Sequence, residues 1–338
     1  MTRCMKVLQT QEQYTFIYEA LVEAIQYEDT SVPLEKIGMY LKELNHMSTL
    51  DQRALILKQY NKLNRGQKKV DANRCSVALS EVNIFKNRDP LTVPEDAACV
   101  KVYVDDRNED HIGYINAVFV DGYRKKGAYI VTQMPMTHTT EDFWRMIYQY
   151  RSSFIVMLNG SDETDDLNVG IYWPELGGCS YGEFEVDVIT YEEHEDFIIR
   201  IMRLTNSLQM NEEPHEVIQF QYKAWSSEMK PASMLKLLRN TDLWYHKSAG
   251  GPITVHCMDG ATRSGLFIAA CFIRDQINSE EVLDTFQVVK SIRLNRPEFI
   301  PNSDQYRFLF EVAQELADPV IHRYEELNQP SKKLSFKI

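Results

Sequence analysis

Apolar residues along the chain follow two different patterns. Short alternating or continuously apolar segments predict strands, and they lie at 100–104, 114–120, 129–131, 155–158, 184–189, 198–204 and 253–255. Helical spacing, with apolar residues at i, i+3 and i+4, covers two helices in 34–63 and the segments 264–278, 280–293 and 303–317. Strands flanked by helices predict an α/β (α+β) domain built on a mixed β-sheet.

A heptapeptide near the start of the chain resembles one near its end. Residues 13–19 are Gln-Tyr-Thr-Phe-Ile-Tyr-Glu and residues 305–311 are Gln-Tyr-Arg-Phe-Leu-Phe-Glu, both within helical patterns. Two unrelated amphipathic helices would explain the likeness. The alternative is that residues 1–30 hold the last helix of a preceding homologous domain, or a linker. The main domain would then span 31–318, followed by a C-terminal tail at 319–338.

Charge and cysteine content narrow the classes of function. The chain has 338 residues and a formal net charge of −12, which disfavours binding to nucleic acid or anionic membranes. The sequence has neither a signal peptide nor the roughly 18–20 consecutive apolar residues of a membrane span, so we expect no direct membrane insertion. Six scattered cysteines without a C-x-x-C pair indicate a reducing compartment, with no metal site, disulfide scaffold or cofactor expected.

One segment contains a pattern that can support chemistry. An apolar strand ends in His256-Cys257, five residues follow, and Arg263 precedes a helix that starts near Ser264. Such a loop can wrap backbone N–H groups around a tetrahedral oxyanion, with the arginine holding two of its oxygens. The same field would lower the pKa of the cysteine and make Cys257 a nucleophile. The predicted phosphate loop consists of His256, Cys257, Met258, Asp259, Gly260, Ala261, Thr262, Arg263 and Ser264.

Several further motifs, in this order, resemble those of protein tyrosine phosphatases. They are Lys-Asn-Arg at 86–88, Tyr-Ile-Asn-Ala at 114–117, Asp-Gly-Tyr at 121–123, Thr-Gln-Met-Pro at 132–135, Glu-Asp-Phe-Trp at 141–144 and Tyr-Trp-Pro at 172–174. The resemblance covers nearly the whole chain. It implies a highly twisted mixed β-sheet flanked by helices.

The resemblance also implies a place in a larger receptor. Residues 7–14 look like the end of one phosphatase domain that leads into another, as in tandem receptor-type phosphatases. The chain is therefore similar to the membrane-distal second domain, often called D2. This implies a cytoplasmic location in a single-pass plasma-membrane receptor, with the preceding catalytic domain as a partner and phosphotyrosine proteins or signalling proteins as further partners.

Three positions depart from the family pattern in ways that would remove catalytic groups. Ser227 stands where the family has the aspartate that acts as general acid, and its loss costs roughly 10²–10⁴ in rate. Asp89 replaces the tyrosine that stacks on the substrate ring. Pro301 replaces the glutamine that positions water in the second step. We expect no rescue by the adjacent Glu228, and we expect Trp225 to anchor the loop before Ser227.

Further departures lie in the phosphate loop and around its arginine. Asp259 adds a carboxylate beside the expected dianion and should raise the pKa of Cys257. Thr262 replaces a glycine and would be strained if that position needs φ > 0. Met258 also differs from the family pattern. The glutamate that helps to hold the catalytic arginine in the family corresponds to Gln149, which brings no charge.

The combined losses favour an inactive or nearly inactive regulatory domain, with Cys257 as a vestigial nucleophile and Arg263 as a phosphate-binding relic. Two alternatives remain. The first is a slow or selective phosphatase that uses the Cys257 thiolate, and the second is a phosphotyrosine-binding module without turnover. A redox-sensitive Cys257 is a minority interpretation.

Overall fold

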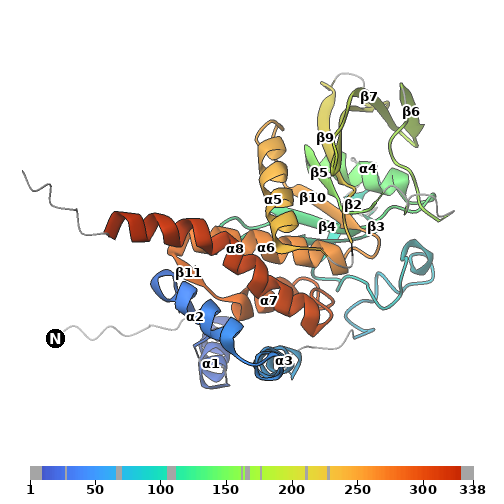
Figure 1. Ribbon diagram of the computed structural model, residues 1–338. Helices are drawn as coiled ribbons and strands as arrows, with labels where there is room; N and C mark the ends of the chain where they lie inside the picture. Colours follow the sequence, from blue (N-terminus) through green and yellow to red (C-terminus); the bar gives the residue numbers. More distant parts are fainter. Residues whose placement is uncertain are drawn as a thin grey trace, which may run out of the picture.

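A mixed β-sheet forms the centre of the computed structural model (Figure 1). The structure describes residues 10–26, 29–65, 71–104, 112–160, 163, 168–175, 177–209, 212–226 and 229–328. Within them, nine strands lie in the order β2-β3-β4-β10-β5-β9-β8-β7-β6. The strands are β2 Cys99–Tyr103, β3 Ile112–Val120, β4 Tyr129–Gln133, β5 Phe154–Met157, β6 Gly178–Tyr181, β7 Phe184–Glu193, β8 Phe197–Asn206, β9 His215–Tyr222 and β10 Ile253–Cys257.

The four central strands are parallel. Strand β10 pairs with both β4 and β5, β5 pairs with β9, and antiparallel strands complete the sheet on either side. Every residue of β4 and β5 is buried, as expected for parallel strands that are covered on both faces. Alternate residues along β5 belong to two separate apolar clusters, Val156 to one and Ile155 to the other.

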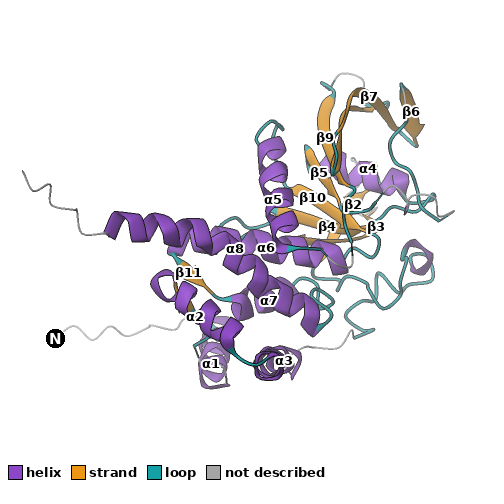
Figure 2. Ribbon diagram, viewed as in Figure 1, coloured by secondary structure: helices purple, strands orange, loops and turns teal. Residues whose placement is uncertain are grey.

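Helices cover the two faces of the sheet unequally (Figure 2). Helix α4 packs on the cluster that contains Ile155, and most of the remaining helices pack on the opposite cluster. The helices are α1 Gln11–Gln26, α2 Leu34–His46, α3 Thr49–Arg65, the 3-10 helix η1 Ile84–Lys86, α4 Thr140–Gln149, α5 Pro231–Tyr245, α6 Thr262–Glu280, α7 Thr285–Arg293 and α8 Ser303–Asn328. A small sheet pairs β1 Val32–Pro33 with β11 Val282–Leu283.

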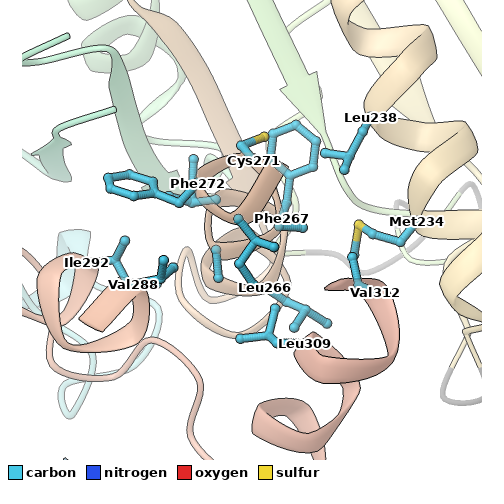
Figure 3. Close-up of a cluster of buried hydrophobic side chains, with 14 of the residues drawn as sticks. Met234, Leu238, Leu266, Phe267, Cys271, Phe272, Val288, Ile292, Leu309 and Val312 are labelled. Atoms are coloured by element: carbon cyan, nitrogen blue, oxygen red, sulfur yellow. The ribbon is translucent and has the colours of Figure 1, made fainter. Parts of the chain in front are cut away.

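Helix α6 lies at the centre of the larger apolar cluster (Figure 3). Its Leu266 and Phe267 lie among side chains from α5, α7 and α8, such as Leu238, Ile292 and Leu309. Twelve of its residues are buried, which explains why its sequence is apolar on most sides rather than along one stripe. This packing fixes the N-terminus of α6, where the predicted phosphate loop ends.

The predicted fold class is confirmed, and the differences from the sequence prediction are local. Strand β9 was not predicted, because Gln219 and Gln221 interrupt its apolar pattern although both are buried. Helices α4 and α5 were also missed. Helix α8 continues beyond residue 318 into the segment that the sequence assigned to the tail. Among the described residues, no helix has the length and apolar content needed to cross a bilayer.

The outer edge of β2 is occupied by α4 and the residue that follows it. The Gln149 side chain accepts a hydrogen bond from the Tyr103 N–H at 3.0 Å and donates one to the Tyr103 carbonyl at 2.7 Å. The Tyr150 hydroxyl donates to the Lys101 carbonyl at 2.7 Å. These side chains take the place that another strand would occupy.

Candidate functional site

The predicted phosphate loop connects β10 to α6. At its turn, Gly260 has φ +67, and a Cβ there would lie 2.6 Å from the backbone of Thr132 and Gln133. Only glycine fits, because both the backbone conformation and the space exclude a side chain. Thr262 is the first residue of α6 and does not have positive φ. The condition for strain at Thr262 is therefore not met, since the left-handed residue of this loop is Gly260.

Asp259 folds back into the loop and binds its donors. One carboxylate oxygen, Oδ1, accepts the N–H groups of Ala261 and Thr262, each at 2.9 Å. The same oxygen accepts the Cys257 thiol at 3.1 Å, and the Thr262 hydroxyl donates to Oδ2. Burial opposes ionisation of the Asp259 carboxyl, but these hydrogen bonds outweigh it, so its pKa lies below the usual value. An ionised carboxylate therefore occupies donors of the loop.

Cys257 is buried at the end of β10 and is held as a thiol. The Ser264 hydroxyl donates to its sulfur at 3.1 Å, and the sulfur in turn donates to Asp259. Burial and the Asp259 charge together raise the pKa of Cys257 to about 11. Roughly one thiol in 10⁴ is then ionised at pH 7, so the group is a poor nucleophile.

Arg263 is bound by Glu163 rather than by Gln149. Its two terminal nitrogens donate to the two Glu163 oxygens at 2.6 and 2.5 Å, and one of them also donates to the Leu158 carbonyl at 2.9 Å. Gln149 stands where the family has the glutamate that helps to hold this arginine, but its side-chain amide binds the edge of β2 instead. Glu163 was missed because it lies in an acidic run that resembles a solvated loop, 100 residues before its partner.

His256 is fully buried and belongs to a polar network beneath the loop. Its Nε2 lies 2.7 Å from the Tyr172 hydroxyl, which also accepts a hydrogen bond from the Gln219 amide at 2.6 Å. Arg200 donates to the Gln219 oxygen at 2.7 Å. Burial lowers the pKa of His256 to about 3, so the imidazole is neutral.

A second network fixes the loop from the other side. Arg296 is almost fully buried and donates to the Gly260 carbonyl at 2.9 Å and to the Asn116 side chain at 2.5 Å. The Asn116 amide donates to Asn87, which precedes the predicted recognition residue Asp89 by two positions. These contacts connect the phosphate loop to the segment before β2.

The replacement residues around the loop have structural roles of their own. The Asp89 carboxylate accepts the N–H of Leu91 at 2.9 Å and the hydroxyl of Thr92 at 3.1 Å, so it caps its own turn. Pro301 is exposed and follows Ile300, a buried residue with φ +54. It offers neither an amide side chain nor a backbone N–H to the site.

Trp225 and Met258 pack beside the loop. Trp225 is partly buried against the larger apolar cluster, and the Arg263 guanidinium lies 5.8 Å from its ring centre. Its role as a loop anchor stays a prediction. Met258 packs on the cluster that contains Ile155. Ser227 and Glu228 lie outside the described residues.

The site combines a cysteine whose pKa is raised, a carboxylate that accepts two N–H groups of the loop and an arginine that is paired with a glutamate. A match to the family model "Protein-tyrosine phosphatase" covers residues 83–315. The chain belongs to the protein-tyrosine phosphatase family. In the segment from Cys257 to Arg263, two N–H groups, the thiol and the arginine bind partners within the chain.

Several curated relatives are receptor-type phosphatases. Human receptor-type tyrosine-protein phosphatase alpha is 34% identical over 319 residues, which cover 94% of this chain and 39% of that protein. The human epsilon protein is 33% identical, with 93% and 45% covered, and the chicken protein named U is 32% identical, with 93% and 22% covered. The chain thus spans less than half the length of these relatives.

Proposed function

We propose that this phosphatase-family chain is a catalytically inactive or nearly inactive domain that regulates an active phosphatase. The observation that carries the proposal is the Asp259 carboxylate, which accepts two loop N–H groups, the Thr262 hydroxyl and the Cys257 thiol. A phosphate dianion would need those donors, and it would meet a negative charge at the same place. Two unit charges about 4 Å apart repel by roughly 4 kcal/mol at an effective dielectric of about 20.

The same carboxylate also acts on the nucleophile. In an active enzyme the loop donors and the arginine stabilise a thiolate, whereas here the thiol donates its proton towards a carboxylate. Ser227 and Pro301 would further remove the general acid and the water-positioning amide that the family pattern provides. These changes act on one catalytic unit, so their costs do not add, but each lowers turnover.

The proposal places the chain as the second of two phosphatase-like domains, in the cytoplasmic part of a single-pass receptor. Support comes from the resemblance between α1 and α8. Tyr306 and Phe310 of α8 are 0% and 7% exposed in the domain core, whereas their counterparts Tyr14 and Tyr18 in α1 are 62% and 60% exposed.

Two further pairs of corresponding residues show the same difference in exposure between α1 and α8. Ile17 and Leu21 of α1 are exposed, while the corresponding Leu309 and Ala313 of α8 are buried. A helix whose exposed apolar face carries the residues of a phosphatase core helix fits a second phosphatase-like domain as its occupant. This domain is the partner that the regulatory function would act on.

A turnover assay tests the function. The purified chain should hydrolyse a phosphotyrosine peptide at least about 10²-fold more slowly than an active receptor-type phosphatase domain, as expected for a missing general acid alone. Any residual activity should disappear in Cys257→Ser. Turnover comparable to that of the active domain would contradict the proposal and favour a selective cysteine-dependent enzyme.

The partner is tested separately in the longest natural protein that contains the chain. Ile17→Asp should lower the melting temperature of the domain that precedes α1, because it places a charge on the apolar face. Thr15→Asp, at an exposed position between two residues of that face, is the matched control. Equal melting temperatures for the two variants would contradict the assignment of α1 to a neighbouring domain.

A further inference from the structure

The hairpin of β7 and β8 presents an exposed tyrosine near its turn. A hydrogen bond from the His194 N–H to the Phe197 carbonyl closes the turn, and Tyr191 lies three residues before His194. Tyr191 is 50% exposed. Among the residues whose burial is described, it is the only exposed tyrosine outside α1. Its hydroxyl donates to the Glu193 carboxylate at 3.0 Å.

The backbone around Tyr191 is extended and open on one side. Strand β7 pairs with β8 along its whole length, but its pairing with β6 ends at Asp187 (Figure 1). The Val188 N–H binds the Gly177 carbonyl, and no described strand pairs with the outer edge of β7 from Thr190 to Glu193. Enzymes and binding domains commonly recognise such an edge by adding main-chain hydrogen bonds to it.

The residues after Tyr191 are strongly acidic. Glu192, Glu193, Glu195 and Asp196 follow within five positions, and the first three are exposed. An exposed tyrosine in an extended strand, followed by carboxylates, presents both the acceptor hydroxyl and a charge pattern that a basic substrate groove can recognise. Charged edges also discourage aggregation, which accounts for the acidic residues but not for the exposed phenol.

We propose that Tyr191 is a phosphorylation site for a tyrosine kinase that prefers acidic residues after the target tyrosine. The kinase would transfer the γ-phosphoryl group of ATP to the phenolic oxygen of Tyr191. The O–H bond of the tyrosine and the bond from the γ-phosphorus to the bridging oxygen break, a new P–O bond forms, and ADP leaves. The proton passes to a base of the kinase.

Two cations lie near the Tyr191 side chain and its neighbour Glu193. Arg200 lies 5.6 Å from the Tyr191 ring centre, and the Lys223 ammonium binds Glu193 at 2.7 Å. A phosphate carries a charge of about −1.5 to −2 at pH 7 and would compete with Glu193 for that lysine. The hydrogen bond from the Tyr191 hydroxyl to Glu193 would be replaced by repulsion, so the modification would rearrange the charges at this end of the hairpin.

The test treats the folded chain with ATP and a tyrosine kinase domain that phosphorylates the acidic copolymer of glutamate and tyrosine. Mass spectrometry should detect phosphate on Tyr191, and the modified peptide should be absent in Tyr191→Phe. Tyr222→Phe, at a buried position on β9, should leave the Tyr191 phosphopeptide unchanged. A synthetic peptide of residues 186–197 provides the unstructured reference.

Charge dependence gives a second readout. Glu192→Lys should slow phosphorylation of Tyr191 by about tenfold, the effect of losing one favourable charge contact. Glu213→Lys, an equal change at an exposed site elsewhere, should have no effect. The proposal is overturned if the folded chain stays unmodified at Tyr191 while the peptide reacts, if neither reacts, or if both charge variants react as fast as the wild type.

Discussion

Removing the Asp259 carboxylate should convert the loop into an oxyanion site. In Asp259→Ala, the N–H groups of Ala261 and Thr262 and the Thr262 hydroxyl lose their internal acceptor and become available to a ligand. Arg263 stays beside the loop in its pair with Glu163, so one cationic group remains in place. The Cys257 pKa should fall from about 11, because the second of its two main causes has been removed.

The size of the effect follows from the charges. A carboxylate in the loop repels a bound anion by about 4 kcal/mol at about 4 Å and an effective dielectric of about 20. Partial exposure to solvent can lower this repulsion to about 1 kcal/mol, so we use a range of about 1–4 kcal/mol. Since about 1.4 kcal/mol corresponds to tenfold in affinity, orthovanadate or tungstate should bind about 10- to 10³-fold more tightly. The loop itself should lose about 1–2 kcal/mol of stability with its internal hydrogen bonds.

Calorimetric titration with tungstate measures this gain, and the rate of alkylation by iodoacetamide against pH reports the Cys257 pKa. Asp259→Asn is the matched control, because its amide oxygen can still accept the loop donors while its charge is absent; we expect a smaller gain. Asp89→Ala removes a carboxylate that caps a separate turn and should change neither readout. Unchanged tungstate affinity and an unchanged thiol pKa in Asp259→Ala would refute the argument.

Three further predictions concern stability. Glu163→Gln should lower the free energy of unfolding by about 1–2 kcal/mol in urea titrations. Hydrogen bonds from Arg263 outweigh burial and lower the pKa of Glu163, so this difference should be complete above pH 4.5 and vanish as the pH falls through the lowered pKa. A difference that does not change with pH would contradict the ion pair. Burial lowers the pKa of His256 from 6.5 to about 3, so below pH 6.5 the unfolded state binds a proton that the folded state does not. The free energy of unfolding should therefore fall by about 2 kcal/mol between about pH 6.5 and 5. His256→Asn should not show this pH dependence. Glu281, the residue that follows α6, has φ +55, and Glu281→Gly should raise the melting temperature by removing about 1 kcal/mol of backbone strain. A lower melting temperature would count against strain at this position.

The sequence predicts the sheet and the loop well because both leave local signals. The predicted strand segments became strands whose ends lie within four residues of the predicted ones. The cysteine of the loop is the last residue of β10, and the arginine lies in the first turn of α6. Strand β9 has no such signal, because its buried glutamines are satisfied by partners on distant segments, such as Tyr172 for Gln219. Burial of a polar residue depends on these partners, and a single sequence does not reveal them.

The sequence predicted which residues form the loop but not the contacts within it. Repulsion by Asp259 was expected, whereas its role as an acceptor for its own loop was not. A local signal did exist, since aspartate commonly accepts the N–H groups two and three residues later, as Asp259 does with Ala261 and Thr262. Glu163 left no comparable signal, because a pair formed across 100 residues depends on the whole fold.

The two ends of the central sheet differ in a way that limits self-association. At one end, Gln149 and Tyr150 bind the outer edge of β2. At the other end, the last strand is the short β6, and the part of β7 beyond it also has no described neighbour on that side. If two copies joined through β7, both outward ends of the combined sheet would be β2 edges, which are already occupied. Strand pairing between copies could therefore produce a pair but not a growing fibre, since a fibre needs an open edge on each side of every copy.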